Sequence, residues 1–185
     1  MRVIAGSARS LPLKTPSGLE VRPTTDRIKE TLFNMLAPYI PGSRFLDLFS
    51  GSGAIGIEAL SRGAASAVFV EKDPRALSCI RENLAFTHLS DRGEVIAADV
   101  FDALRKLSSF PGEPFTVVFM DPPYRKDLEK DVLLSMKDLP YVTRDTVFIA
   151  EAALDTDLSW IPDSGYFLMK QKKYKTNQHL WLRKN

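Results

Sequence analysis

The stretch "FLDLFSGSGAIGIEAL", residues 45–60, decides the fold class. It begins as an apolar run, passes through Gly51, Gly53 and Gly56 in the spacing G-x-G-x-x-G, and continues as an apolar helical pattern. Such glycines let a ligand approach the backbone, and free N–H groups at a helix start favour polar or anionic ligand groups. The acidic Glu71 follows twenty positions after Gly51. This pattern predicts a nucleotide-binding loop between a strand and a helix.

Outward from this loop, short apolar runs alternate with helical patterns. Strands are predicted at residues 44–49, 66–71, 93–99, 115–121 and 146–152, and helices at residues 54–62, 74–87, 100–109 and 126–139. Two further runs, at residues 165–175 and 179–184, have no helix between them. The order predicts an α/β fold, with a mostly parallel seven-stranded sheet, helices on both faces and a C-terminal antiparallel hairpin.

The residues before this core predict a small extension. Residues 2–6 and 19–22 are expected to form an irregular antiparallel hairpin, and a helix is expected to open at Pro23 and to stop before Pro38. The predicted division is therefore an N-terminal hairpin and helix over residues 1–42, followed by the core over residues 43–185.

Composition narrows the class of protein. The chain has 185 residues, of which 44% are hydrophobic and 26% charged, which suits one ordinary globular domain. No apolar run is long enough to cross a bilayer, and the N-terminus lacks the apolar region of a signal peptide. Cys79 is the only cysteine. We therefore expect a cytoplasmic protein with no disulfide and, with only two histidines, no metal site.

Charge is distributed unevenly along the chain. The net charge is +2, but residues 1–30 carry +3, residues 165–185 carry +6 and the middle carries −7. Basic ends around an acidic middle favour a polyanionic partner that is bound mainly by the termini. A solvated lysine-rich tail is the alternative interpretation.

Four predicted strands carry an acid at or near their carboxyl end, namely Asp47, Glu71, Asp99 and Asp121. Open α/β sheets bind ligands at the carboxyl ends of their strands. Asp47 would repel a pyrophosphate, but it suits the methionine end of S-adenosylmethionine, which carries an ammonium group. Glu71 suits a ribose diol in either case, because a carboxylate accepts hydrogen bonds from two hydroxyls.

The stretch "VVFMDPPYRKD", residues 117–127, distinguishes between these ligands. Pro122 and Pro123 have fixed φ angles and no N–H, so the backbone there is rigid. The carboxylate of Asp121 and the carbonyl of Pro122 can accept both hydrogens of an exocyclic amino group, which favours its attack on a methyl group. Tyr124 offers a flat face for stacking a base, worth about 1–3 kcal/mol.

These residues resemble the S-adenosylmethionine-dependent amino-methyltransferases, a Rossmann-like class I fold whose final strand is inserted antiparallel. The stretches "RVIAGSARSLPLKTP", "RPTTDRIKETLFNML" and "GSGAIGIEALSRGA", together with "DPPY", resemble the small-subunit ribosomal RNA methyltransferase D family over nearly the whole chain. That family methylates N2 of a guanine in 16S rRNA. One position departs from its pattern, because Lys175 follows Tyr174 where a Tyr-Gly pair is common.

The resemblance implies a role for each matching position. Asp121, Pro122, Pro123 and Tyr124 would hold and stack the guanine. The residues implied to bind S-adenosylmethionine are Arg22, Thr24, Asp47, Ser50, Gly51, Gly53, Glu71, Lys72, Asp99 and Val100.

The expected partner is small-subunit rRNA, either naked or within a partly or fully assembled 30S particle. The basic residues expected to bind RNA are Arg9, Lys14, Arg125, Lys126, Lys172 and Lys173. A target base must leave its stack to reach such a site. A monomer is expected.

Three alternatives remain open from the sequence. A nicotinamide oxidoreductase would explain the glycines but would leave Asp121–Tyr124 without a role. A DNA or other RNA amino-methyltransferase, acting on adenine N6 or cytosine N4, would share the chemistry. A non-catalytic rRNA-binding assembly factor would use only the basic ends.

Overall fold

A computed structural model describes residues 1–16, 26–109, 112–123 and 127–185. The predicted site residues Arg22, Thr24, Tyr124, Arg125 and Lys126 lie outside these ranges. The strands are β1 (Arg44–Leu48), β2 (Ser66–Glu71), β3 (Gly93–Ala97), β4 (Val117–Met120), β5 (Val147–Ala153), β6 (Tyr166–Lys173) and β7 (Asn177–Lys184). The helices are α1 (Asp26–Leu36), α2 (Ala54–Ser61), α3 (Pro74–Phe86), α4 (Val100–Ser108) and α5 (Leu128–Met136), with a 3-10 turn, η1 (Ser90–Arg92).

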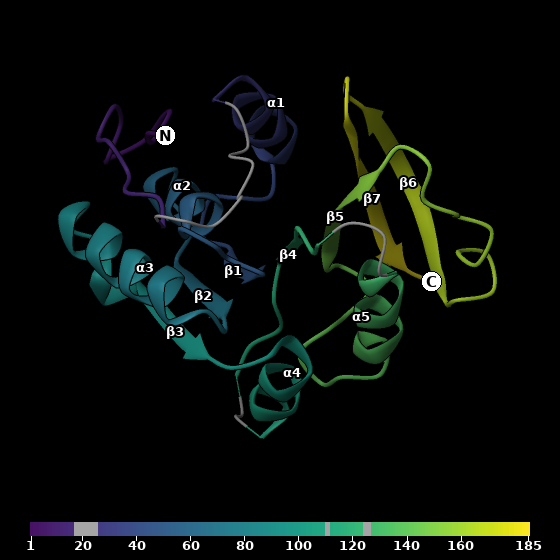
Figure 1. Ribbon diagram of the computed structural model, residues 1–185. Coiled ribbons are helices and arrows are strands. Elements are labelled where there is room, and N and C mark those ends of the chain that lie inside the picture. The colour runs from purple at the N-terminus through teal and green to yellow at the C-terminus, as the bar shows by residue number, and fades with distance from the viewer. Residues whose placement is uncertain (17–25, 110–111, 124–126) are drawn as a thin grey trace.

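The strands form one sheet in the order β3-β2-β1-β4-β5-β7-β6. The first five of these are parallel, and β7 is antiparallel to both β5 and β6 (Figure 1). The order reverses between β1 and β4, which places a topological switch point at the carboxyl ends of these two strands. The predicted fold class is therefore confirmed, including the antiparallel C-terminal hairpin.

Helices cover both faces of the sheet and bury two hydrophobic clusters. One cluster joins the N-terminal segment, α1, α2 and α3 to side chains such as Phe45, Phe119 and Trp181. We call this side of the sheet the α1–α3 face. The other cluster joins α4 and α5 to side chains such as Leu46 and Leu180, and we call this side the α4–α5 face. No helix among the described residues is long and apolar enough to span a membrane.

The prediction of a strand at residues 2–6 is wrong. Within these residues, Arg2 makes an isolated antiparallel bridge to Pro12, and no regular strand follows. The amides of Ile4 and Ala5 instead donate to the carboxylate of Glu58 on α2, at 2.8 and 3.0 Å. A side chain from the core thus takes the amides of Ile4 and Ala5, while Val3 exchanges backbone hydrogen bonds with Leu11 and Ser10. The proposed pairing partner, residues 19–22, lies outside the described residues.

Glu58 also anchors α1. Its side chain is fully buried, and its carboxylate lies 3.2 Å from the Lys29 ammonium, which is also fully buried, and 2.7 Å from Nε of Arg62. Burial lowers the pKa of Lys29, because the charged form loses its hydration. The extension is therefore packed onto the core through a buried charged network as well as through apolar contacts. The division at residue 42 stays a prediction.

Candidate cofactor and catalytic site

The loop from β1 to α2 has the backbone geometry that the glycines predict. Gly51 and Gly53 have φ angles of 55° and 77°, in the left-handed region that favours glycine. Phe49 also has a positive φ of 62°, which is uncommon for a bulky residue and occurs mostly at functional sites. Among the described residues, and apart from its two chain neighbours, no heavy atom lies within 4 Å of the position that a Cβ on Gly51 would occupy. This part of the loop is thus open to a ligand at the amino end of α2.

Gly56 has a different role, in packing. A Cβ on this residue would lie 2.3 Å from the ring of Phe69 on β2, so only glycine lets α2 approach the sheet this closely. The backbone N–H of Gly56 donates to Oδ2 of Asp47 at 2.9 Å. Asp47 is 1% exposed, and burial, with a smaller contribution from Glu71, raises its pKa from 3.8 to about 7. Asp47 therefore fastens the loop to α2, a contact that the sequence did not predict.

This burial predicts a pH dependence of stability. Because the folded-state pKa of Asp47 is raised, its contribution to stability is complete below pH 3.8 and is lost as the pH rises to about 7. Asp47→Asn keeps an oxygen for the Gly56 N–H but removes the titration. We expect chemical denaturation to show a smaller loss of stability from pH 4 to 7 in the variant, by on the order of a few kcal/mol. If stability depends on pH in the same way in Asp47→Asn and in the wild type, the ionisation of a buried Asp47 is contradicted.

Glu71, at the end of β2, holds two loops together. Its Oε2 accepts from the Gly51 N–H at 2.9 Å, while Oε1 accepts from the Lys72 and Asp73 N–H groups at 2.7 and 2.9 Å. In addition, the Ser50 hydroxyl donates to the Asp47 carbonyl at 2.7 Å. The predicted residues Ser50, Gly51, Glu71 and Lys72 are thus brought together around one loop.

Asp99 lies after β3, next to this group. Its carboxylate caps α4 by accepting from the Phe101 N–H at 3.1 Å, and it lies 3.6 Å from the Lys72 ammonium. Val100 is 4% exposed and belongs to the hydrophobic cluster on the α4–α5 face. The side chain of Val100 is therefore part of the core, so a ligand would contact this residue through its backbone atoms.

Asp121 follows β4, the strand beside β1. Its pKa is raised well above the usual range, first by burial and then by the negative charges of Glu151 and Asp47. Pro122 is buried and Pro123 is exposed. The structure thus places a half-buried carboxyl group, with the acids Glu151 and Asp47 nearby, next to the glycine loop, across the switch point of the sheet.

Glu151 and His179 were not predicted as site residues. They are directly opposite on β5 and β7, and His179 Nε2 lies 3.2 Å from Glu151 Oε2. Asn177 donates to Glu151 Oε1, and the Tyr174 hydroxyl lies 3.3 Å from His179 Nδ1. The one signal in the sequence was Glu151, an acid inside the otherwise apolar run "VFIAEA".

The basic residues predicted to bind RNA differ in their surroundings. Arg9, Lys172 and Lys173 are exposed, whereas Lys14 forms an exposed ion pair with Glu82. The structure does not gather these residues into one cluster. None of the described residues forms a group of acids, histidines or cysteines able to hold a metal ion.

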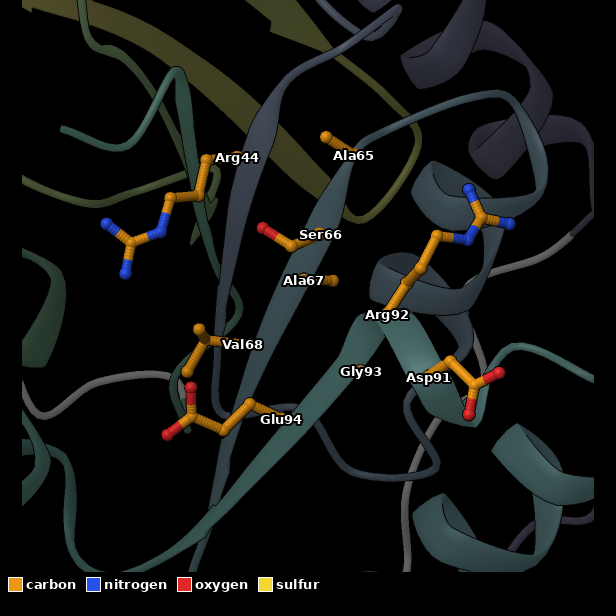
Figure 2. Close-up of a pocket in the computed structure, with 9 residues that line it drawn as sticks. All are labelled: Arg44, Ala65, Ser66, Ala67, Val68, Asp91, Arg92, Gly93 and Glu94. Atoms are coloured by element: carbon orange, nitrogen blue, oxygen red, sulfur yellow. The ribbon is translucent and has the colours of Figure 1, made fainter. Parts of the chain in front are cut away.

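A separate pocket of about 260 Å³ lies at the amino ends of β1, β2 and β3 (Figure 2). It includes Arg44, Ser66 and Gly93, the first residues of these strands. Figure 2 shows Arg44 and Arg92 directed away from each other, and each guanidinium donates to a backbone carbonyl. The pocket is at the opposite edge of the sheet from Asp47, Glu71 and Asp121, and it contains no predicted site residue.

The strand order and the glycine loop define a Rossmann-like protein of the methyltransferase class. Precorrin-6y C5,15-methyltransferase from Geobacter metallireducens has the same fold, with a TM-score of 0.70 at 16% identity over 92% of this chain and 91% of its own. That level of identity shows the fold alone.

Closer relatives give the family. The family model described as conserved hypothetical protein 95 matches residues 1–183. Ribosomal RNA small subunit methyltransferase D of Escherichia coli K12 is 36% identical over 172 residues, which is 93% of this chain and 84% of that protein. A solved structure of a hypothetical protein from Thermus thermophilus has a TM-score of 0.82 at 34% identity, over 98% of both chains. The chain therefore belongs to the ribosomal RNA small subunit methyltransferase D family.

Proposed function

We propose that this protein transfers a methyl group from S-adenosylmethionine to the N2 amino group of a guanine in small-subunit ribosomal RNA. One observation carries the proposal: a half-buried Asp121, followed by two prolines, stands beside the glycine loop on neighbouring strands. A nicotinamide oxidoreductase gives no role to this arrangement. The name of the Escherichia coli relative supports an rRNA substrate.

The residues present fit the proposed cofactor. The open backbone at Gly51 and the N–H groups of Ala54 and Ile55 at the start of α2, which donate to no acceptor among the described residues, suit the carboxylate of the methionine part. Glu71 ends β2 and Asp99 follows β3 by two residues. In the proposed complex they accept from the ribose hydroxyls and the adenine amino group. When bound, the cofactor supplies an electrophilic methyl group on a sulfonium.

Asp121 and Pro122 then act on the substrate. The carboxylate of Asp121 accepts one hydrogen of the guanine amino group, and the carbonyl of Pro122 accepts the other. This pairing orients the nitrogen lone pair and stabilises the positive charge that develops on the nitrogen. The partly buried position of Asp121 strengthens the interaction, because water screens the charge less there than at the surface.

Glu151 sets the pH range of this step. Its negative charge is the second cause of the raised pKa of Asp121. Since the ionised carboxylate is the active form, the rate is expected to rise with pH through that raised pKa. Glu151→Gln should move the midpoint of the pH–rate profile to lower pH, in single-turnover assays with saturating RNA and cofactor. Burial remains in the variant, so the midpoint should stay above the ordinary carboxyl range. A midpoint that stays in place or rises would contradict this role.

The activity itself is tested with labelled S-adenosylmethionine. The protein and the cofactor are incubated with one of three substrates: unmodified small subunits, naked small-subunit rRNA or a DNA duplex. Buffer alone is the control. The modified nucleotide is then identified by mass spectrometry. N2-methylguanine in rRNA is the expected product. N6-methyladenine or N4-methylcytosine would replace the guanine assignment, and binding of NADH without any methyl transfer would reject the class.

A further inference from the structure

The edge strand β6 carries a row of lysines at the far end of the sheet (Figure 1). Every residue of this strand after Tyr166 is exposed, including Lys170, Lys172 and Lys173. In the described part of the chain, neither Lys170 nor Lys172 has a carboxylate within ion-pair distance, whereas Lys72 has Asp99. Their charges are therefore available to an external anion.

A β-bulge decides which way these lysines point. Tyr166 and Leu168 pair with Lys184 and Leu182, and the register then shifts between Leu168 and Lys170. Tyr166 is buried on the α4–α5 face. Side chains alternate along a regular strand, so without the shift residues 170 and 172 would share the face of Tyr166.

The extra residue reverses that arrangement. Lys170 is opposite Trp181 and Lys172 is opposite His179. Trp181 is buried on the α1–α3 face, and His179 stacks edge-on against Phe119 of the same face. The bulge thus turns both lysines to the α1–α3 face, a re-aiming that bulges near active sites commonly provide.

Phe119 of β4 belongs to the cluster on the α1–α3 face, so side-chain alternation directs Asp121, two residues further on, to the same face as these lysines. The register relates Lys172 to His179, and His179 to Glu151. Met120 pairs with Ala150, so Asp121 comes next to Glu151 on the following strand. Three strand spacings separate the backbones of Asp121 and Lys172, or about 14 Å. That span reaches the phosphates of nucleotides close to a base held at Asp121.

We propose that Lys170 and Lys172 bind backbone phosphates of the RNA that flanks the target guanine. The inference rests on the proposed function and adds the side from which the RNA approaches. A base that is flipped into the site leaves its neighbouring phosphates on the surface outside it, where lysines supply the sequence-independent part of the affinity. Lysines on an edge strand also prevent unwanted strand pairing. Lysines on either face of the sheet would prevent strand pairing. Binding of phosphates near the target base, in contrast, requires the lysines to lie on the same face as Asp121.

The test compares the two faces by the salt dependence of RNA binding. Unmodified small-subunit rRNA is titrated with the protein at several salt concentrations. Lys170→Ala/Lys172→Ala should reduce the slope of log K against log salt by about 1.4, since each contact to a single strand contributes about 0.7. It should raise KM for RNA and leave kcat unchanged. The control Lys106→Ala/Lys184→Ala removes the same charge on the α4–α5 side and should keep the wild-type slope.

A single pair of neighbours sharpens the comparison. Lys172 and Lys173 are both exposed, but Lys173 pairs with Gln178 and points to the opposite face. Lys172→Ala should therefore reduce the slope more than Lys173→Ala. Equal slopes for the two double variants, or a larger effect of Lys173→Ala, would overturn the inference. If the wild type binds RNA but transfers no methyl group, the proposed function fails. The slopes of log K against log salt would still test whether Lys170 and Lys172 bind RNA phosphates.

Discussion

Asp121→Ala is expected to lower the turnover of rRNA methylation by about 10²–10³-fold, the cost of removing one preorganised group that stabilises developing charge. Asp121 is half-buried near the buried acids Asp47 and Glu151, so its charge is screened less than it would be at the surface. The glycine loop lies on a different strand, and the affinity for S-adenosylmethionine should stay within a few-fold of the wild-type value. Single-turnover kinetics and calorimetric titration measure the two quantities separately.

Two further variants separate charge from shape. Asp121→Asn keeps an acceptor of the same size but removes the negative charge, so its turnover should fall between those of the wild type and Asp121→Ala. Asp145→Ala is a matched control, because Asp145 is an exposed acid before β5, at the opposite edge of the sheet. Its turnover should equal that of the wild type. A near-normal turnover in Asp121→Ala would reject the proposed catalytic role.

The core of the fold was predictable because its signals are local. The strand predicted at residues 66–71 is β2 with the same bounds, and the helix predicted at residues 74–87 is α3 to within one residue. Apolar β-branched runs, and a proline in the first turn of α3, determine these elements without help from distant residues. The strand-end acids follow from the same alternation, which brings them to one edge of the sheet.

Features that depend on distant contacts were not predictable. The N-terminal residues look like a strand, but the buried Glu58 takes the amides of Ile4 and Ala5. His179 has no motif around it, and only the pairing of β5 with β7 places it on Glu151. The bulge in β6 leaves no mark in the sequence, because the shift is set by what β7 presents opposite each residue. The partners of the N-terminal segment and of His179 are far away in the chain, whereas the bulge depends on how β6 pairs with the next strand, β7.

Glu58→Gln is expected to be the most destabilising of the substitutions considered. Removing one member of a buried ion pair leaves the other charge uncompensated and typically costs about 3–5 kcal/mol. Here the buried Lys29 ammonium would lose its ionised partner and keep only neutral acceptors, such as the Arg2 carbonyl at 2.5 Å and the amide oxygen of the substituted side chain. Urea denaturation should show the loss, and hydrogen exchange should become faster at the amides of Ile4 and Ala5, which lose a charged acceptor.

The double variant Lys29→Met/Glu58→Gln tests whether the cost comes from the unpaired ammonium. An apolar side chain of similar length at position 29 removes the buried charge, so the double variant should recover part of the lost stability. Arg2→Ala provides the contrast, because the ion pair of Arg2 with Asp26 is largely exposed and should contribute about 0–1 kcal/mol. Stability of Glu58→Gln within about 1 kcal/mol of wild type would mean that apolar packing alone holds the extension, since the charged network would then add no more than an exposed pair does.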